Sequence, residues 1–142
     1  MKVMLLLKGD PRGRDLPQEE LIGAMLRYNE ELVKAGVLLA AEGLYDSSTG
    51  ARVVYKAGRR TVVDGPFTEA KELIAGFMLI QVKSMDEAIE WAKRCPVEYA
   101  VLNDEEEAVV EIRQVAEAEE LPTMNDELLA ADRRIREQLP GI

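Results

Sequence analysis

Residues 76–82, Gly-Phe-Met-Leu-Ile-Gln-Val, decide the fold of this chain, because a capped helix follows them almost at once. A short, nearly continuous apolar run of this kind is typical of a strand. Ser84 and Glu87 then have the spacing of a capping box, and apolar residues recur at helical intervals over 85–95 until Pro96. The sequence therefore predicts a strand that leads directly into an amphipathic helix.

The same strand-then-helix pattern opens the chain. Residues 3–7 are an apolar run, and after a glycine- and proline-containing break, capping-box spacing at Asp15 and Gln18 begins a second apolar periodicity that stops near Gly36. Further strands are expected over 37–41, over 52–56 and 60–63 as a hairpin through Ala57-Gly58, and over 108–115. The resulting order is β-α-β-β-β-α-β. With the hairpin as an insertion, this is the split βαβ pattern of a ferredoxin-like α+β fold, with two helices on one face of an antiparallel sheet.

The apolar strands also predict an assembly. Residues 3–7, 37–41 and 77–80 do not alternate polar with apolar, as the strands of a sheet with one wet face would. The helices can cover only one face, so we expect a second copy to pack on the other and form a homodimer.

An apolar stripe from Met124 to Leu139, after cap-spaced Thr123 and Asp126, predicts a C-terminal helix. It offers two alternatives: the helix folds back over the open face, or it embraces the partner subunit. We expect one domain over 1–118 and a helical extension over 119–142.

Composition excludes several function classes. A net charge of −9 and a pI near 4.7 argue against sequence-independent nucleic-acid binding and against anionic membranes. No segment is long and apolar enough to predict a membrane span or a signal peptide, so a cytoplasmic location is the expectation. The chain has no histidine and one cysteine, Cys95, which excludes conventional histidine chemistry and an internal disulfide and favours core packing of the thiol. The acidic run 104–107 is interpreted as a solvated loop, and no metal and no cofactor are expected.

Asp64-Gly65-Pro66-Phe67 is the strongest site signal. Pro66 fixes its own φ, and Gly65 is expected to adopt backbone angles that other residues avoid, so Asp64 would be presented in a fixed direction. The alternative is that Asp64 only caps the turn through nearby backbone N–H groups.

Together with other segments, this motif resembles a known family. The matching residues are Asp64-Gly65-Pro66-Phe67 with Glu69, Lys71 and Glu72, residues 36–38 and 42–44, residues 88–92, and Cys95-Pro96. They resemble the DGPF-domain branch of the YCII-related proteins over about residues 1–115. The resemblance implies a ferredoxin-like α+β fold that dimerises into an α/β barrel, and it implies little about activity.

The wider family carries a histidine on the first helix, thought to work with an aspartate after the first strand. Met25 stands about where the histidine would be, whereas Asp10 matches the aspartate. A histidine-dependent mechanism therefore does not carry over to this chain, and carboxylates are the expected acid–base groups.

The candidate site is a pocket between the sheet and the first helix, or between the two sheets of a dimer. We take Asp10 and Asp64 as candidate catalytic residues, and the candidate ligand-binding residues are Arg27, Tyr28, Glu42, Gly65, Glu69 and Lys71. Ordinary salt bridges are the alternative for these charges. Two functions stay open: a small-molecule-binding or enzymatic cleft, and a regulatory module that binds a protein partner, with a link to sigma-factor control of transcription implied by relatives.

Overall fold

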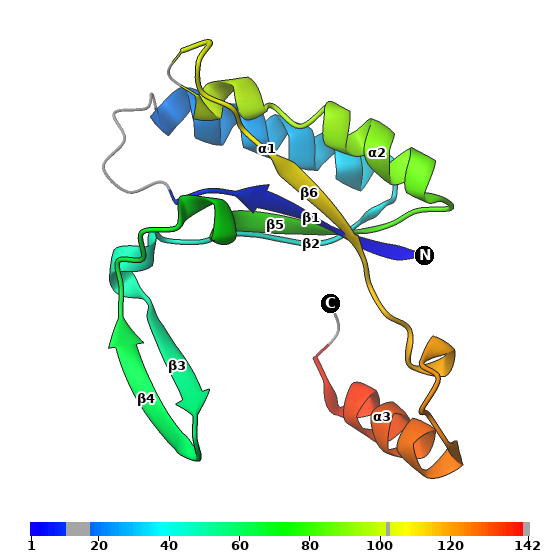
Figure 1. Cartoon of the computed structure of the whole chain (residues 1–142). Helices are drawn as coiled ribbons and strands as arrows, with labels where there is room; N and C mark the ends of the chain where they lie inside the picture. The colour runs from blue at the N-terminus through cyan, green and yellow to red at the C-terminus, as the bar shows by residue number, and fades with distance from the viewer. Residues whose placement is uncertain (11–17, 102, 141–142) are drawn as a thin grey trace.

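The computed structural model describes residues 1–10, 18–101 and 103–140 (Figure 1). Its strands and helices are β1 (Lys2–Lys8), α1 (Gln18–Lys34), β2 (Leu38–Gly43), β3 (Ala51–Lys56), β4 (Arg59–Asp64), β5 (Ile74–Gln81), α2 (Met85–Lys93), β6 (Val110–Gln114) and α3 (Asp126–Gln138). Short 3-10 turns lie at η1 (Ser47–Thr49), η2 (Ala70–Glu72), η3 (Val97–Ala100) and η4 (Ala118–Glu120). The predicted order of elements is confirmed.

Four strands form one antiparallel sheet in the order β2-β5-β1-β6, while β3 and β4 pair only with each other. Figure 1 shows α1 and α2 side by side on one face of the sheet. This is the ferredoxin-like α+β arrangement with an inserted hairpin, so the predicted fold is confirmed. The dimeric barrel that the resemblance implies stays a prediction.

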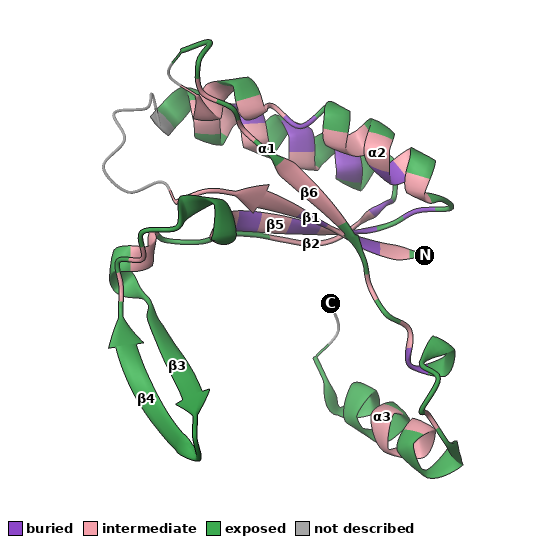
Figure 2. Ribbon diagram, viewed as in Figure 1, coloured by how far each residue is buried: buried purple, intermediate pink, exposed green. Residues whose placement is uncertain are grey.

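The core fills the space between the sheet and the two helices. In the register of β1 with β5, Val3 lies opposite Ile80 and Leu5 opposite Met78, and all four side chains are almost completely buried with Leu32 of α1. Burial of an aliphatic side chain of this size contributes about 1.5–3 kcal/mol. Figure 2 places the buried residues of the sheet and helices in this layer.

Local capping explains where the helices begin and end. Gly36, at φ 75°, ends α1, and the Gly36 and Val37 N–H groups donate to the Val33 and Leu32 carbonyls in a Schellman motif. The Ser84 side chain accepts from the Glu87 N–H at 3.2 Å, as predicted, although the Glu87 carboxylate reaches back to the N–H of Lys83. The predicted cap at Asp15 lies outside the described residues.

The C-terminal helix differs from the prediction in its cap. Its cap is Asn125, whose side chain accepts from the Leu128 N–H at 2.9 Å, and not Thr123, which lies two residues too early. Figure 1 shows α3 hanging apart from the sheet, on the side opposite α1 and α2. Of the two alternatives for this segment, the structure does not show packing on the open face, and contact with a partner subunit stays a prediction.

The inserted hairpin also leaves the body of the molecule. Ala57 and Gly58, both at positive φ, make its two-residue turn, and every residue of β3 and β4 is exposed. The hairpin and α3 project from opposite ends of the sheet toward the same side (Figure 1). The sheet face between them carries the partly exposed side chains of Met4, Leu6 and Leu79, and nothing in the described part of the chain packs over it as α1 and α2 pack over the other face.

Candidate functional site

Three loops meet at the end of the sheet where β1 and β2 finish and β5 begins. The Gly9 N–H donates to the Leu73 carbonyl at 2.9 Å, and the Leu44 N–H donates to the Ala75 carbonyl at 2.8 Å, which fixes these loops to one another. Asp10 leaves β1, η1 follows β2, and the Asp64-Gly65-Pro66-Phe67 motif precedes β5. The fold thus brings three distant stretches of sequence together.

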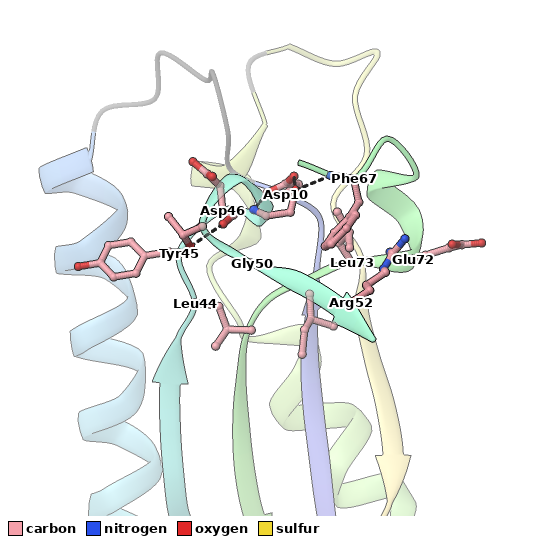
Figure 3. A pocket seen from close by; sticks show the side chains of 12 residues that line it. Asp10, Leu44, Tyr45, Asp46, Gly50, Arg52, Phe67, Glu72 and Leu73 are labelled. Carbon is pink, nitrogen blue, oxygen red and sulfur yellow. Dashed lines mark hydrogen bonds between the residues drawn. The ribbon is translucent and has the colours of Figure 1, made fainter. Parts of the chain in front are cut away.

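Asp10 joins these loops through Ser47. One carboxylate oxygen of Asp10 accepts from the Ser47 N–H at 2.9 Å, and the other accepts from the Ser47 hydroxyl at 2.5 Å. The same hydroxyl accepts from the Phe67 N–H at 3.0 Å (Figure 3). Hydrogen bonds to an ionised acceptor are stronger than neutral ones, so this chain of contacts holds η1 and the motif in a fixed relation to β1.

Gly65 is required for a different reason from the one the sequence suggested. Its φ is not positive, and its N–H donates to the Gly50 carbonyl at 2.9 Å. A Cβ atom at this position would lie 1.7 Å from the Ser47 carbonyl oxygen, a distance that no side chain tolerates. The prediction of unusual backbone angles is therefore wrong, and close approach of two backbones is what demands glycine. The Gly65-Pro66 peptide bond is cis.

Phe67 carries the next part of the site. The guanidinium carbon of Arg52, on β3, lies 3.8 Å from the centroid of the Phe67 ring. A cation over an aromatic face is attracted by about 0.5–1 kcal/mol at an exposed position. The base of the hairpin is thus attached to the motif, with a cationic group beside it.

A cavity of about 520 Å³ lies among these groups. Its polar lining comes from Asp10, Asp46, Ser47, Thr49, Arg52 and Glu72, and its apolar lining from Leu44, Tyr45, Phe67, Leu73 and Ile74, with Gly50 completing the wall. Figure 3 shows these side chains gathered at the end of the sheet. We call this cavity the Asp10 pocket.

Among the predicted site residues, Asp10 lines this pocket and Gly65 packs against Ser47 beside it. Asp64 ends β4 with its side chain exposed, and its carboxylate has no hydrogen bond to any residue that the structure describes. Glu69 and Lys71 are exposed in and beside η2. Glu42 is exposed on β2, opposite Phe77.

The two predicted residues of α1 lie away from the Asp10 pocket. Arg27 borders a second cavity of about 430 Å³ with Glu19, Glu20 and Tyr99. Tyr28 is buried in the core, where its hydroxyl donates to the Trp91 carbonyl at 2.7 Å, and burial raises its pKa. The predicted space between sheet and first helix is filled by the core, so the structure does not bring all eight predicted residues into one pocket. Their functional roles stay predictions.

Sequence reasoning missed Ser47, Arg52 and Glu72 as neighbours of Asp10. The sequence predicts a loop over 46–50, and it predicts Arg52 as the start of a strand and as a possible partner in an ordinary salt bridge. The glycine at position 65 was the available signal, because glycine can mark a place where two backbones approach closely. It does not identify Ser47 as the residue that approaches. Met25, at the position of the family histidine, packs against the core.

Cys95 is 2% exposed and belongs to the core, so the predicted packing role is confirmed. Burial, with a smaller contribution from Glu98, raises the pKa of its thiol to about 12. Within residues 1–10, 18–101 and 103–140, no group of three or more histidine, cysteine or acidic side chains could hold a metal ion. No helix in the described part of the chain combines the length and the apolar character needed to cross a membrane.

Comparison with known proteins places this architecture in a family. A family model described as the YCII-related domain matches residues 1–119. The chain belongs to the YCII-related family. The predicted family is therefore confirmed, and the DGPF branch is consistent with it as a subfamily.

One curated relative of this YCII-related protein is "Uncharacterized protein R00369" of Rhizobium meliloti (strain 1021), with 35% identity over 75 residues. The match covers 53% of this chain and 60% of the relative, so the chain spans about three-fifths of that protein. Among solved structures, 5-chloro-2-hydroxyhydroquinone dehydrochlorinase from Burkholderia phenoliruptrix AC1100, in complex with 2,5-dihydroxybenzoquinone, is similar at a TM-score of 0.46 and 17% identity. That similarity covers 82% of this chain and 94% of the other.

Proposed function

We propose that this YCII-related protein binds a small organic molecule in the Asp10 pocket. The observation that carries the proposal is the convergence of a fixed carboxylate, a fixed guanidinium and apolar walls around one cavity of about 520 Å³. Ligand sites typically combine a largely apolar lining with a few convergent polar groups.

Two of the charged groups at the pocket suggest the chemistry of the ligand, and the carboxylates of Asp46 and Glu72 also line it. Arg52 presents guanidinium N–H donors, which suit a carboxylate or another planar anion. Asp10 presents an acceptor, held by Ser47, that suits a hydroxyl or amine. We therefore expect a molecule with an apolar, flat body, an anionic group toward Arg52 and a hydrogen-bond donor toward Asp10.

Asp10 is also the candidate proton acceptor if the bound molecule reacts. A carboxylate can act as general base where no histidine is present. Asp64, the second candidate catalytic residue, lies outside the pocket lining, so in this proposal it contributes to the hairpin rather than to the bound molecule.

The test is binding of 4-hydroxybenzoate, which has an anionic group, a ring and a hydroxyl, with 4-hydroxybenzamide as the uncharged analogue. We expect the acid to bind at least tenfold more tightly than the amide in calorimetry, because only the acid pairs with Arg52. Arg52→Gln should abolish this preference. Arg94→Gln is a matched control, since it removes a guanidinium 4.4 Å from another aromatic centroid, that of Trp91, far from the pocket. Equal affinity of acid and amide, or equal effects of the two variants, would contradict the proposal.

We also propose that the working unit is a homodimer that packs sheet against sheet. Met4, Leu6, Phe77 and Leu79 support it, because the register places them together on the face that α1 and α2 do not cover. Light scattering during size-exclusion chromatography measures the molar mass of the protein in solution. A monomer at all concentrations would contradict the proposal.

The second candidate function is a regulatory role through binding to another protein. The cytoplasmic location stays a prediction for either function. The large exposed apolar side chains of the hairpin and of α3 favour an interaction with protein. A monomeric protein would leave those surfaces for a partner other than a second copy.

A further inference from the structure

The hairpin formed by β3 and β4 exposes more apolar surface than an isolated element can carry comfortably. Val53 and Val62 face each other across the strands at 68% and 69% exposure, and Tyr55 beside them is 64% exposed. Val54 and Val63 are exposed on its other face. A two-stranded hairpin is only marginally stable alone in water, so these side chains indicate a surface that is covered in the working molecule.

The C-terminal segment shows the same property. Leu128, Ile135 and Leu139 recur at helical spacing along and just beyond α3 and are 47%, 62% and 54% exposed. Figure 2 shows α3 as a mostly exposed helix that is separate from the sheet. Its apolar stripe therefore lacks a covering element within the described part of the chain.

The two segments carry opposite charge. Residues 51–64, which we call the basic hairpin, contain the four basic residues Arg52, Lys56, Arg59 and Arg60 and the single acidic residue Asp64. Residues 117–139, which we call the acidic arm, contain seven acidic and three basic residues. A basic segment is unusual in a chain with net charge −9, and complementary charge favours and orients association.

Their positions prevent them from meeting within one chain. The basic hairpin leaves the end of the sheet where β1 finishes, the acidic arm leaves the end where β6 finishes, and both extend past the open face (Figure 1). A two-fold axis in the plane between two facing sheets, perpendicular to the strands, exchanges the two ends. It therefore places the basic hairpin of one protomer and the acidic arm of the other at the same end of the paired sheets.

We infer that the basic hairpin of each protomer docks on the acidic arm of a second copy of this chain, so that two reciprocal contacts clasp the dimer. The inference rests on the sheet-to-sheet homodimer proposed above and adds its orientation and its specificity. Val53, Tyr55 and Val62 supply one apolar face, and Leu128 and Ile135 supply the other. The base of the hairpin lines the Asp10 pocket through Gly50 and Arg52, so the partner's acidic arm lies at the same end of the sheet as that pocket.

Cross-linking tests the orientation. Thr61 on the hairpin and Gln138 on α3 are exposed and uncharged, and the natural Cys95 is buried, so the unmodified chain serves as an unreactive background. With a flexible bis-maleimide, the double variant Thr61→Cys/Gln138→Cys should form covalent dimers in high yield. Each single variant should remain largely uncross-linked, because the docking places like segments at opposite ends.

The outcomes separate this inference from the sheet dimer. Cross-linking of Thr61→Cys alone, or no cross-linking of the double variant in a protein that light scattering shows to be dimeric, overturns the docking and leaves the sheet dimer standing. A monomer overturns both.

A charge exchange tests the specificity. The variant Arg59→Glu/Arg60→Glu should raise the dimer dissociation constant at least tenfold, and adding Glu119→Arg/Glu120→Arg should restore most of the loss. The matched control is Lys83→Glu/Lys93→Glu, which reverses two charges at exposed positions before and at the end of α2 and should leave the constant within about twofold. A four-substitution variant that dimerises no better than the first one would contradict the pairing.

Discussion

The two faces of the four-stranded sheet carry similar side chains and differ in what covers them. On β1, Val3 and Leu5 are completely buried under α1 and α2, while their neighbours Met4 and Leu6 point to the open face and are partly exposed. A strand alternates its side chains between faces, so apolar residues at consecutive positions require two apolar environments. The described part of the chain supplies one of them, and the open face is where the proposed second copy would pack.

The largest expected effect comes from replacing a leucine on the covered face with alanine, compared with the same replacement on the open face. Leu5→Ala should lower the free energy of unfolding by about 2–5 kcal/mol, because it leaves a cavity in the closed core. Leu6→Ala, its immediate neighbour, should cost much less in dilute protein, and its cost should grow with protein concentration as dimers form. Urea denaturation at two protein concentrations measures both. Equal costs at low concentration would remove the distinction between the faces.

A charged residue on the open face tests whether that face forms the dimer interface. Leu79→Lys should leave the fold intact and shift the protein to monomer, with at least a tenfold higher dissociation constant, because a dimer would bury the ammonium group unpaired. Circular dichroism checks the fold, and sedimentation checks the assembly. Glu30→Gln changes the net charge equally on α1 and should change neither. An unaltered dimer in Leu79→Lys would place the interface elsewhere.

Alkaline pH tests the covered face alone. The Cys95 thiol keeps its proton to about pH 12 in the folded protein, whereas in the unfolded chain it ionises from its usual pKa of 9.0. The unfolded state therefore loses a proton first, and stability should fall as pH rises between these values, by up to about 1.4 kcal/mol per pH unit. Tyr28 acts in the same direction at higher pH. Denaturation of the Cys95→Ala variant should show a shallower decline above pH 9, and an identical slope would argue against the burial of this thiol.

The smallest expected effect comes from removing the N-cap of α2. Ser84→Ala removes the acceptor for the Glu87 N–H and should cost about 1 kcal/mol. The loss should appear as faster amide hydrogen exchange in α2. Ser84→Asp retains an acceptor and should restore protection, so a variant that behaves like alanine would mean that the cap is not what holds the start of α2.

The sequence predicted the covered face and the hairpin turn well, because the signals for both are local. The capping serine, the stop at Gly36 and the hairpin turn at Ala57-Gly58 are each determined by residues close in sequence, and the structure confirms all three. The predicted cap at Thr123 was wrong, because Thr123 and Asn125 both have side chains that can cap a helix and only the actual start of α3 distinguishes them.

The candidate site was predicted less completely, because its contacts join residues far apart in the chain. Asp10 and Ser47 are separated by 37 positions, and Ser47 and Phe67 by 20. No local pattern encodes such pairs. Tyr28 illustrates the converse, since it lies next to Arg27 in sequence but points into the core, as the helical period requires.

The junction of Ser47, Gly65 and Phe67 has a mechanical consequence for the hairpin. Because the backbones pack this closely at its base, we expect the hairpin to tilt there only together with the loops it contacts. A strand of six residues is about 20 Å long, so a tilt of roughly 10° at the base displaces the tip by about 3 Å. A molecule in the Asp10 pocket that tilts this base would therefore also displace the far end of the hairpin and whatever that end touches.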